Sequence, residues 1–157
     1  MSSTVQNIGS EMSLEEWENV YWKKDFTPFH KTDGPHTLLI EFYDFIFGLK
    51  QRHRIFVPLC GKTKSMLWLA SKGHDVVGLE YSPIAVKSFF DDNGLLFECS
   101  DHTNSKLKIF KAVGLNITIF QGDIFDANAQ VLGTFDVIWD RGSFTSIYPP
   151  KRPRYLE

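Results

Sequence analysis

Between residues 54 and 92 the chain passes twice from a short apolar run into a helical pattern, and this repeat constrains the fold more than any other feature. The strands and helices expected here are, in chain order, residues 54–59, 64–71, 75–79 and 83–92. Ser82 is well placed to cap the second helix, with Pro83 at the first helical position. A strand–helix–strand–helix order predicts parallel strands joined by right-handed crossovers.

Three more strands are expected downstream of this repeat. Residues 107–111 and 116–121 are typical of an antiparallel pair, and residues 95–106 form a polar connection that leads into it. The apolar run FDVIW at residues 135–139 indicates another buried strand. The predicted fold class is therefore α/β, with a mostly parallel sheet and helices on both faces.

The first 50 residues are expected to form two helices outside the sheet. Residues 1–12 are polar and aperiodic, which is typical of a disordered tail. A capping-box pattern at Ser13 and Glu16 opens a helix over residues 13–24. Apolar positions that recur every three to four residues indicate a second helix over residues 36–49.

Length, charge and cysteine content exclude several classes of protein. A chain of 157 residues is long enough for one globular domain with a substantial core. A net charge of −2 argues against nucleic-acid binding, and no apolar stretch reaches the roughly 18 residues of a membrane-spanning helix. The N-terminus lacks the pattern of a secretory signal and two cysteines are too few for a disulfide framework, so we expect a cytoplasmic protein. Five histidines without metal-ligand spacing give no reason to expect a metal site.

Parallel α/β sheets bind ligands beyond the carboxyl ends of their strands, so the residues that follow each strand are candidates for function. These candidates are Leu59 and Gly61 where the first strand ends, Glu80 after the second, Asp123 and Ile124 after the 116–121 strand, and Arg141 after the last. Glu80 lies nineteen residues after Gly61, where nucleotide-binding α/β proteins place an acid that binds both ribose hydroxyls. A solvated turn residue is the alternative interpretation of Glu80.

The single glycine of the first turn, Gly61, discriminates between cofactors. A dinucleotide carries a pyrophosphate, and additional glycines let the backbone approach it closely. S-adenosyl-L-methionine has no phosphate, so one glycine in a turn is sufficient for it. A nicotinamide-dependent oxidoreductase fits the strand order and Glu80, but the chain lacks the glycines expected of one.

Several other positions allow more than one interpretation. Asp123 either meets the adenine edge of a nucleotide or caps the helix that follows it. Arg141 pairs with the preceding aspartate, orients the cofactor or contacts a polarised substrate. A nucleophilic Cys60 would require a lowered thiol pKa, and packing of a small residue in the turn is favoured instead. The helix of Trp17 and Trp22 either belongs to the core or forms a lid over the cofactor.

Five segments together resemble the thiopurine S-methyltransferase family. They are LEEWENVYW, FTPFHKTDGPH, RIFVPLCGKTKSMLWLASKGHDVVGLEYSPIAV, GDIFD and FDVIWDRG. The resemblance runs from residue 13 to residue 155, with gaps only in 95–115, and the combination of PLCGK, GH-VVG-E and IWDRG is more specific than any single piece. It implies a Rossmann-like class I methyltransferase fold and an S-adenosyl-L-methionine cofactor.

The resemblance also implies roles for individual residues. The implied cofactor-binding residues are the lid aromatics Trp17, Trp22 and Phe29, the turn residue Leu59, the ribose-binding acid Glu80, the adenine-flanking pair Asp123 and Ile124, and the active-site arginine Arg141. Phe29 also matches a position that contacts the aromatic substrate. Family members often have a small residue where Asp123 stands, so a backbone role is better supported there than a side-chain role.

The implied reaction, of the EC 2.1.1 class, transfers a methyl group from the cofactor to the sulfur of an aromatic or heterocyclic thiol. Arg141 would favour the thiolate electrostatically, and no general base is assigned. The small-molecule thiol is the only partner implied, because the resemblance points to a monomer.

The chain ends soon after the fourth parallel strand, whereas family members continue through a further helix and several strands. We therefore expect a C-terminally truncated methyltransferase domain over residues 13–157, with the lid helix at 13–24. Its sheet would be incomplete, with an unpaired apolar edge on the last strand. A truncated, non-catalytic cofactor-binding fragment or isoform is the alternative to an active enzyme.

Overall fold

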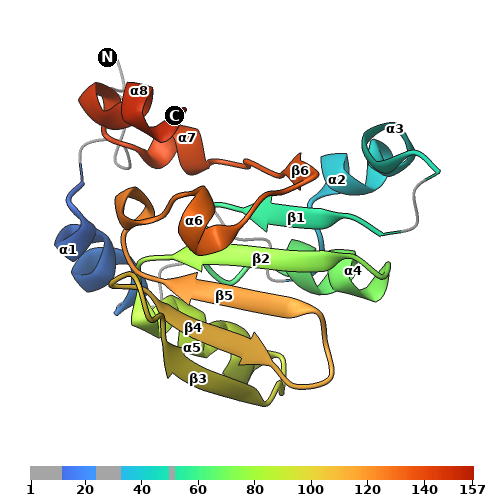
Figure 1. Cartoon of the computed structure of the whole chain (residues 1–157), viewed down its shortest axis with the longest axis horizontal. Helices are drawn as coiled ribbons and strands as arrows, with labels where there is room; N and C mark the ends of the chain where they lie inside the picture. Colours follow the sequence, from blue (N-terminus) through green and yellow to red (C-terminus); the bar gives the residue numbers. More distant parts are fainter. Residues whose placement is uncertain (1–11, 24–32, 50–51) are drawn as a thin grey trace, which may run out of the picture.

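The structure, a computed structural model, describes residues 12–23, 33–49 and 52–157. Phe29 and all but the last residue of the expected 1–12 tail lie outside these ranges. The described part is built around a six-stranded sheet in the order β3-β4-β5-β2-β1-β6 (Figure 1). The strands are β1 (Arg54–Val57), β2 (Asp75–Glu80), β3 (Phe97–Asp101), β4 (Lys108–Ala112), β5 (Ile117–Gln121) and β6 (Val137–Ile138).

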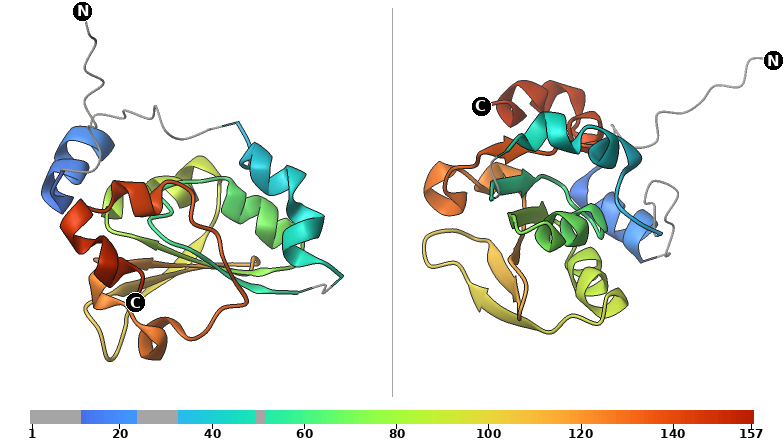
Figure 2. Two further views of the ribbon diagram at one scale, coloured as in Figure 1. Left: turned by 90° about the horizontal axis from the view of Figure 1, so that it is seen from above. Right: turned by 90° about the vertical axis from the view of Figure 1, so that its right-hand side faces the viewer.

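Most of the helices are short. In chain order they are α1 (Leu14–Glu16), the π-helix η1 (Trp17–Trp22), α2 (Thr37–Glu41), α3 (Tyr43–Phe47), α4 (Ser65–Ser71), α5 (Pro83–Asp92), η2 (Ile124–Asp126), α6 (Ala129–Leu132), α7 (Ser143–Ser146), η3 (Pro149–Lys151) and α8 (Arg152–Tyr155). Helices α4 and α5 lie on one face of the sheet, and α6 lies on the other (Figure 2). Within the described ranges, every helix is too short or too polar to span a lipid bilayer.

The sheet is mostly parallel, as predicted. Strands β5, β2, β1 and β6 run parallel, and β3 and β4 extend the β5 edge as an antiparallel pair. The expectation that residues 95–106 form only a polar connection was wrong, because residues 97–101 form β3. Four of the five residues of β3 are exposed, while Phe97 packs against the larger hydrophobic layer, so this strand is held mainly by backbone pairing with β4.

The side chains of β2 alternate between two hydrophobic layers. Val76 packs in the larger layer with residues of α4 and α5, whereas Val77 and Leu79 pack in the smaller layer with Leu132 of α6. Both faces of the central strands are therefore covered, which explains why these strands are almost uniformly apolar.

The N-terminal helices depart from the regular geometry that their periodicity predicted. The capping box between Ser13 and Glu16 is present, but the helix changes into the π-helix η1 after three residues. The helix expected over residues 36–49 is divided into α2 and α3 at Phe42, whose backbone leaves the helical region.

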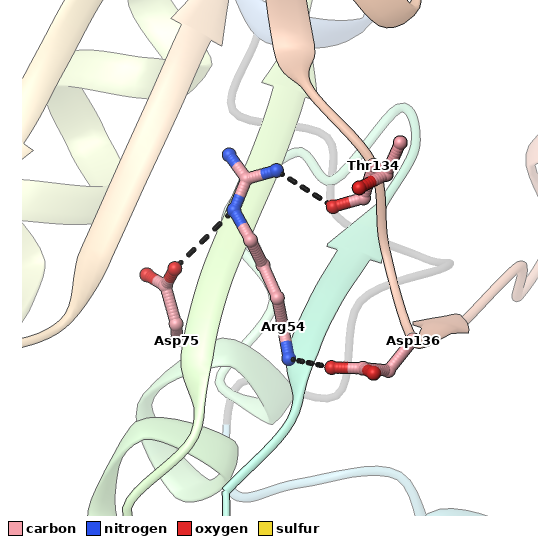
Figure 3. A network of polar contacts seen from close by, with 4 residues as sticks. All are labelled: Arg54, Asp75, Thr134 and Asp136. Atoms are coloured by element: carbon pink, nitrogen blue, oxygen red, sulfur yellow. Dashed lines mark hydrogen bonds and ion pairs between the residues drawn. The ribbon is translucent and has the colours of Figure 1, made fainter.

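Strand β6 is the shortest strand and forms one edge of the described sheet. Only two residues of the expected 135–139 strand pair with β1. Arg54 anchors the segment that precedes β6, because its guanidinium donates to the Thr134 carbonyl at 2.9 Å and its backbone N–H donates to the Asp136 carboxylate at 2.8 Å (Figure 3). The same guanidinium lies 3.3 Å from the Asp75 carboxylate, which connects this segment to β2.

Candidate functional site

The turn after β1 holds the backbone in a conformation that few residues adopt. Leu59 and Gly61 are both left-handed, with φ angles of 42° and 50°. Such a φ is strained for leucine and unstrained for glycine. Between them, the Cys60 N–H donates to the Leu79 carbonyl at 2.9 Å and attaches the turn to β2. The single glycine of this segment therefore serves a left-handed turn that also contains a strained leucine.

Cys60 packs into the interior beneath this turn. Its side chain is 3% exposed, and a Cβ added to Gly78 would lie 2.7 Å from its sulfur. Burial, reinforced by the charge of Glu80, raises the pKa of the thiol well above its usual value. A protonated thiol is a poor nucleophile, so the geometry supports a packing role for Cys60.

Glu80 reaches the same turn from the end of β2. One of its carboxylate oxygens accepts the Gly61 N–H at 2.8 Å, and the other accepts the Ser82 N–H at 2.9 Å. The side chain is 7% exposed, and burial raises its pKa although the backbone N–H groups act in the opposite direction. A carboxylate that accepts one bond on each oxygen keeps acceptor capacity on both for a ligand.

Ser82 fixes the start of α5 beside this carboxylate. Its hydroxyl accepts the Ala85 N–H at 3.1 Å, and Pro83 occupies the first turn of the helix. This geometry confirms the cap expected from the sequence. The N-terminus of α5 is thereby held next to Glu80.

The π-helix η1 carries Trp17 and Trp22, two of the aromatics expected to form a lid. The Lys23 N–H donates to the Glu18 carbonyl five residues earlier. This bonding pattern is rare in proteins overall but is often found at functional sites. In such a helix Trp17 and Trp22, also five residues apart, lie about one turn apart. Both rings contact Tyr21 edge-on, at centroid distances of 5.1 Å and 5.0 Å.

Glu18 is a candidate site residue that sequence reasoning missed. Its Oε2 atom is buried and has no hydrogen-bond partner within the part of the chain that the structure describes. Its charge contributes to the raised pKa of Glu80, so the two carboxylates lie close enough to interact. No spacing rule connects these two positions; they meet because η1 packs against α5.

Asp123 follows β5 and caps the short helix η2. Its side chain accepts the Phe125 N–H at 3.0 Å, which is the capping alternative that the sequence allowed. The adjacent Gly122 N–H donates to the Glu80 carbonyl at 2.9 Å, so the backbone here lies beside the end of β2. Ile124 packs against the smaller hydrophobic layer.

Asp140 organises the segment that follows β6. Its Oδ1 atom accepts the N–H groups of Ser143 and Phe144, at 3.0 Å and 3.2 Å, and its Oδ2 atom accepts the Tyr155 hydroxyl at 2.8 Å. The aspartate thus fixes the start of α7 and attaches α8 to it. Arg141, the next residue, lines a hollow at the strand ends.

This hollow, of about 50 Å³, opens between the turn after β1 and the start of α2. Its lining includes Leu59 and Arg141, which the sequence singled out, and His36, which sequence reasoning treated only as the start of a helix. Within the described residues, no group of three or more His, Cys, Asp or Glu side chains is arranged to hold a metal ion.

A mostly parallel sheet, a left-handed turn after its first strand and a buried acid at the end of the second define an α/β protein of the class I methyltransferase type. Comparison with known families gives a narrower assignment. The family model for thiopurine S-methyltransferase matches residues 12–157, and the chain belongs to this family.

Relatives with curated names agree with this assignment. The chain is 37% identical over 149 residues to thiopurine S-methyltransferase from Bos taurus, an alignment that covers 93% of the chain and 59% of the relative. It is 39% identical over 147 residues to the probable thiopurine S-methyltransferase from Danio rerio, with coverages of 92% and 62%. For the Rattus norvegicus enzyme the identity is 35% over 147 residues, with coverages of 93% and 60%. The chain thus spans about three-fifths of the length of these relatives.

Proposed function

We propose that the chain carries an S-adenosyl-L-methionine-dependent methyltransferase domain over residues 13–157, which methylates the sulfur of an aromatic or heterocyclic thiol. The contact between Glu80 and the Gly61 turn carries this proposal. A buried carboxylate with acceptor capacity on both oxygens fits the two hydroxyls of a ribose. The family assignment supports a thiopurine or a related heterocyclic thiol as the methyl acceptor.

The described residues fit this cofactor because it requires a backbone edge and a ribose acceptor but no phosphate cradle. The left-handed turn supplies the edge, and Glu80 supplies the acceptor. The other proposed cofactor residues are Leu59 and Gly61 in the turn, Asp123 through its backbone, Ile124 beside the adenine, Trp17 and Trp22 in the lid helix at 13–24, and Arg141. Phe29, outside the described residues, remains proposed as a contact of both cofactor and substrate.

The cofactor supplies, when bound, a methyl group on a sulfonium that is electrophilic enough to need no covalent intermediate on the protein. The task of the chain is then to hold the acceptor sulfur in line, a contribution worth roughly 7–11 kcal/mol in favourable systems. Heteroaromatic thiols ionise more readily than a cysteine thiol, whose pKa is about 8.5, so we assign no general base. Arg141 favours the thiolate through its positive charge. An Arg141→Ala variant with unchanged turnover and unchanged affinity for thiol and cofactor would rule out this role.

Calorimetric titration with S-adenosyl-L-methionine and S-adenosyl-L-homocysteine, followed by a turnover assay with a heteroaromatic thiol, tests the proposed function. We expect both ligands to bind and the thiol to be methylated. Binding without turnover would favour the alternative of a non-catalytic cofactor-binding protein. A chain that binds neither ligand would refute the proposal.

The substitution Glu80→Gln tests the observation on which the proposal depends. Glutamine keeps one acceptor oxygen but loses the charge and the second acceptor, so affinity for S-adenosyl-L-homocysteine should fall at least about tenfold. Glu98→Gln, on the exposed strand β3, is the matched control and should leave affinity unchanged.

A second comparison separates ribose recognition from damage to the turn. The wild-type chain should bind an adenosine ligand more tightly than its 2′-deoxy counterpart, and Glu80→Gln should reduce this preference. A preference of equal size in both proteins would contradict a ribose-binding role for Glu80, whatever the overall loss of affinity.

A reducing compartment accords with the proposed function. Both cysteines are free thiols, Cys60 buried and Cys99 exposed on β3. An exposed free thiol is typical of proteins that work in the cytosol, so we infer a cytoplasmic location. The resemblance to the family supports a monomer.

A further inference from the structure

The hollow at the ends of β1 and β6 has the chemistry of an anion site. Two basic side chains, His36 and Arg141, line it together with the hydroxyl residues Thr63 and Ser65 and several apolar residues. Among the described residues that line it, none is an aspartate or a glutamate. The cationic Arg141, a histidine ring and hydroxyl groups around this small space favour a negatively charged group.

His36 is held in this hollow as a hydrogen-bond donor. Its ring caps the start of α2, where the Leu38 N–H donates to Nδ1 at 3.3 Å. A ring nitrogen that accepts a bond carries no proton, so the neutral imidazole has its proton on Nε2. The backbone N–H of His36 donates to Ser65 Oγ at 3.1 Å, and the ring centroid lies 6.0 Å from that of Trp139. These contacts fix the ring between α4 and the end of β6.

We propose that His36 is a ligand-binding residue of this hollow and that it holds, together with Arg141, an anionic group of the reactants. The inference rests on the proposed function, which provides two such groups. One is the carboxylate at the methionyl end of the cofactor, and the other is the thiolate of the acceptor. Either group would lie beside Leu59, in the turn after β1.

Two substitutions separate the capping role of His36 from its donor role. His36→Asn keeps an acceptor for the Leu38 N–H, since asparagine is a favoured helix cap, but removes Nε2. His36→Gln extends an amide N–H toward the position that Nε2 occupies. His102→Asn is the matched control, because Nδ1 of His102 accepts the Asn104 N–H at 3.2 Å in the same local geometry, in the loop between β3 and β4.

The cofactor arm of the test compares S-adenosyl-L-homocysteine with 5′-methylthioadenosine, which lacks the amino-acid end. Both are titrated calorimetrically into the full chain. If the cofactor carboxylate is the bound anion, His36→Asn should lower the affinity for S-adenosyl-L-homocysteine about tenfold and leave the affinity for 5′-methylthioadenosine unchanged. His36→Gln should recover part of the loss.

The acceptor arm titrates a heteroaromatic thiol into the chain saturated with S-adenosyl-L-homocysteine. If the thiolate is the bound anion, His36→Asn should lower the affinity for the thiol about tenfold, while the affinity for S-adenosyl-L-homocysteine stays that of the wild type. His102→Asn should match the wild-type chain in both arms.

Two results would overturn the inference while leaving the proposed function intact. In the first, the affinity of His36→Asn for every ligand stays within about twofold of the affinity of His102→Asn. In the second, His36→Asn lowers the affinity for 5′-methylthioadenosine as much as the affinity for S-adenosyl-L-homocysteine, which would indicate a general disturbance of the site. A wild-type chain that binds no S-adenosyl-L-homocysteine would overturn the proposed function, and this inference with it.

Discussion

The contact between Gly78 and Cys60 predicts that β2 and the turn after β1 are coupled in stability. A Cβ added at Gly78 would lie 2.7 Å from Cys60 Sγ and 2.9 Å from Met66 Sδ, closer than such atoms can approach. Gly78→Ala must therefore displace at least one sulfur in a packed layer. Extra methyl groups forced into a core typically cost about 1–3 kcal/mol, so we expect the free energy of unfolding to fall by that amount.

The same geometry predicts that Cys60→Ala rescues part of this loss. Without Sγ, the nearest obstacle is Met66 Sδ on a flexible side chain at 2.9 Å, followed by Cys60 Cβ at 3.3 Å. Alone, Cys60→Ala removes one buried heavy atom and should cost about 1 kcal/mol. The double variant should then be more stable than the sum of the two single effects by about 1 kcal/mol, because both residues use the same space.

Urea unfolding of the wild-type chain, the two single variants and the double variant measures this coupling. Gly34→Ala is the control, because an added Cβ there meets no atom of the described residues within 4 Å and its backbone is not left-handed. Its free energy of unfolding should change by no more than about 0.5 kcal/mol. Additivity of the two substitutions within about 0.3 kcal/mol, or a Gly78→Ala variant as stable as the wild type, would refute the reasoning.

Three further predictions concern other parts of the structure. In urea unfolding, Leu59→Gly should be more stable than Leu59→Ala by about 0.5–1 kcal/mol, because both lose the side chain but only glycine adopts a φ of 42° without strain; the reverse order would contradict this. Burial and the neighbouring His53 lower the pKa of His74 below 6.5, so the native state favours the neutral ring. The contribution of His74 to the free energy of unfolding should therefore be complete above the unfolded-state pKa and should decrease as the pH drops below that pKa. Thermal melts of the wild type and of His74→Gln between about pH 5 and 8 measure this decrease. A wild type that loses no more stability than His74→Gln over this range would contradict the prediction. Arg54→Lys should lower the free energy of unfolding by about 1 kcal/mol. A lysine ammonium lacks the forked geometry with which the guanidinium contacts both the Thr134 carbonyl and the Asp75 carboxylate. An unchanged urea midpoint would exclude this bridging role of Arg54.

Local features of the fold were predictable because they depend on neighbours in the chain. The Ser13 capping box and the Ser82 cap are both present, as are the apolar strands β1 and β2. Strand β3 was missed because it is polar and exposed, and the backbone groups that pair it with β4 leave no trace in the side-chain pattern. The π-helix was missed for a related reason, since apolar spacing cannot distinguish one added residue per turn from a regular helix followed by a loop.

The candidate site was predictable where its residues follow strands and unpredictable where side chains converge from remote elements. The topology of the predicted sheet was enough to select Glu80 and Arg141 as candidates, because the carboxyl ends of parallel strands lie at one edge of a sheet. No comparable rule applies to Glu18, which approaches Glu80 only because η1 packs against α5. His36 has a local role as a helix cap, and its place beside Arg141 depends on how α2 meets the turn after β1.

The strained backbone at Leu59 shows how the main chain builds this site. A leucine with a φ of 42° costs about 1–2 kcal/mol relative to a right-handed conformation. Two hydrogen bonds from the next residues offset this strain: the Cys60 N–H donates to the Leu79 carbonyl, and the Gly61 N–H donates to the Glu80 carboxylate. A neutral bond and a charge-assisted bond contribute about 1 and 1.5–3 kcal/mol respectively, which is sufficient to hold the turn. Both acceptors lie at the end of β2, so the strand that supplies the carboxylate also maintains the turn that would act with it. A ligand that engages the remaining acceptor positions of Glu80 therefore meets a turn already in place, and binding requires less ordering than it would from a flexible loop.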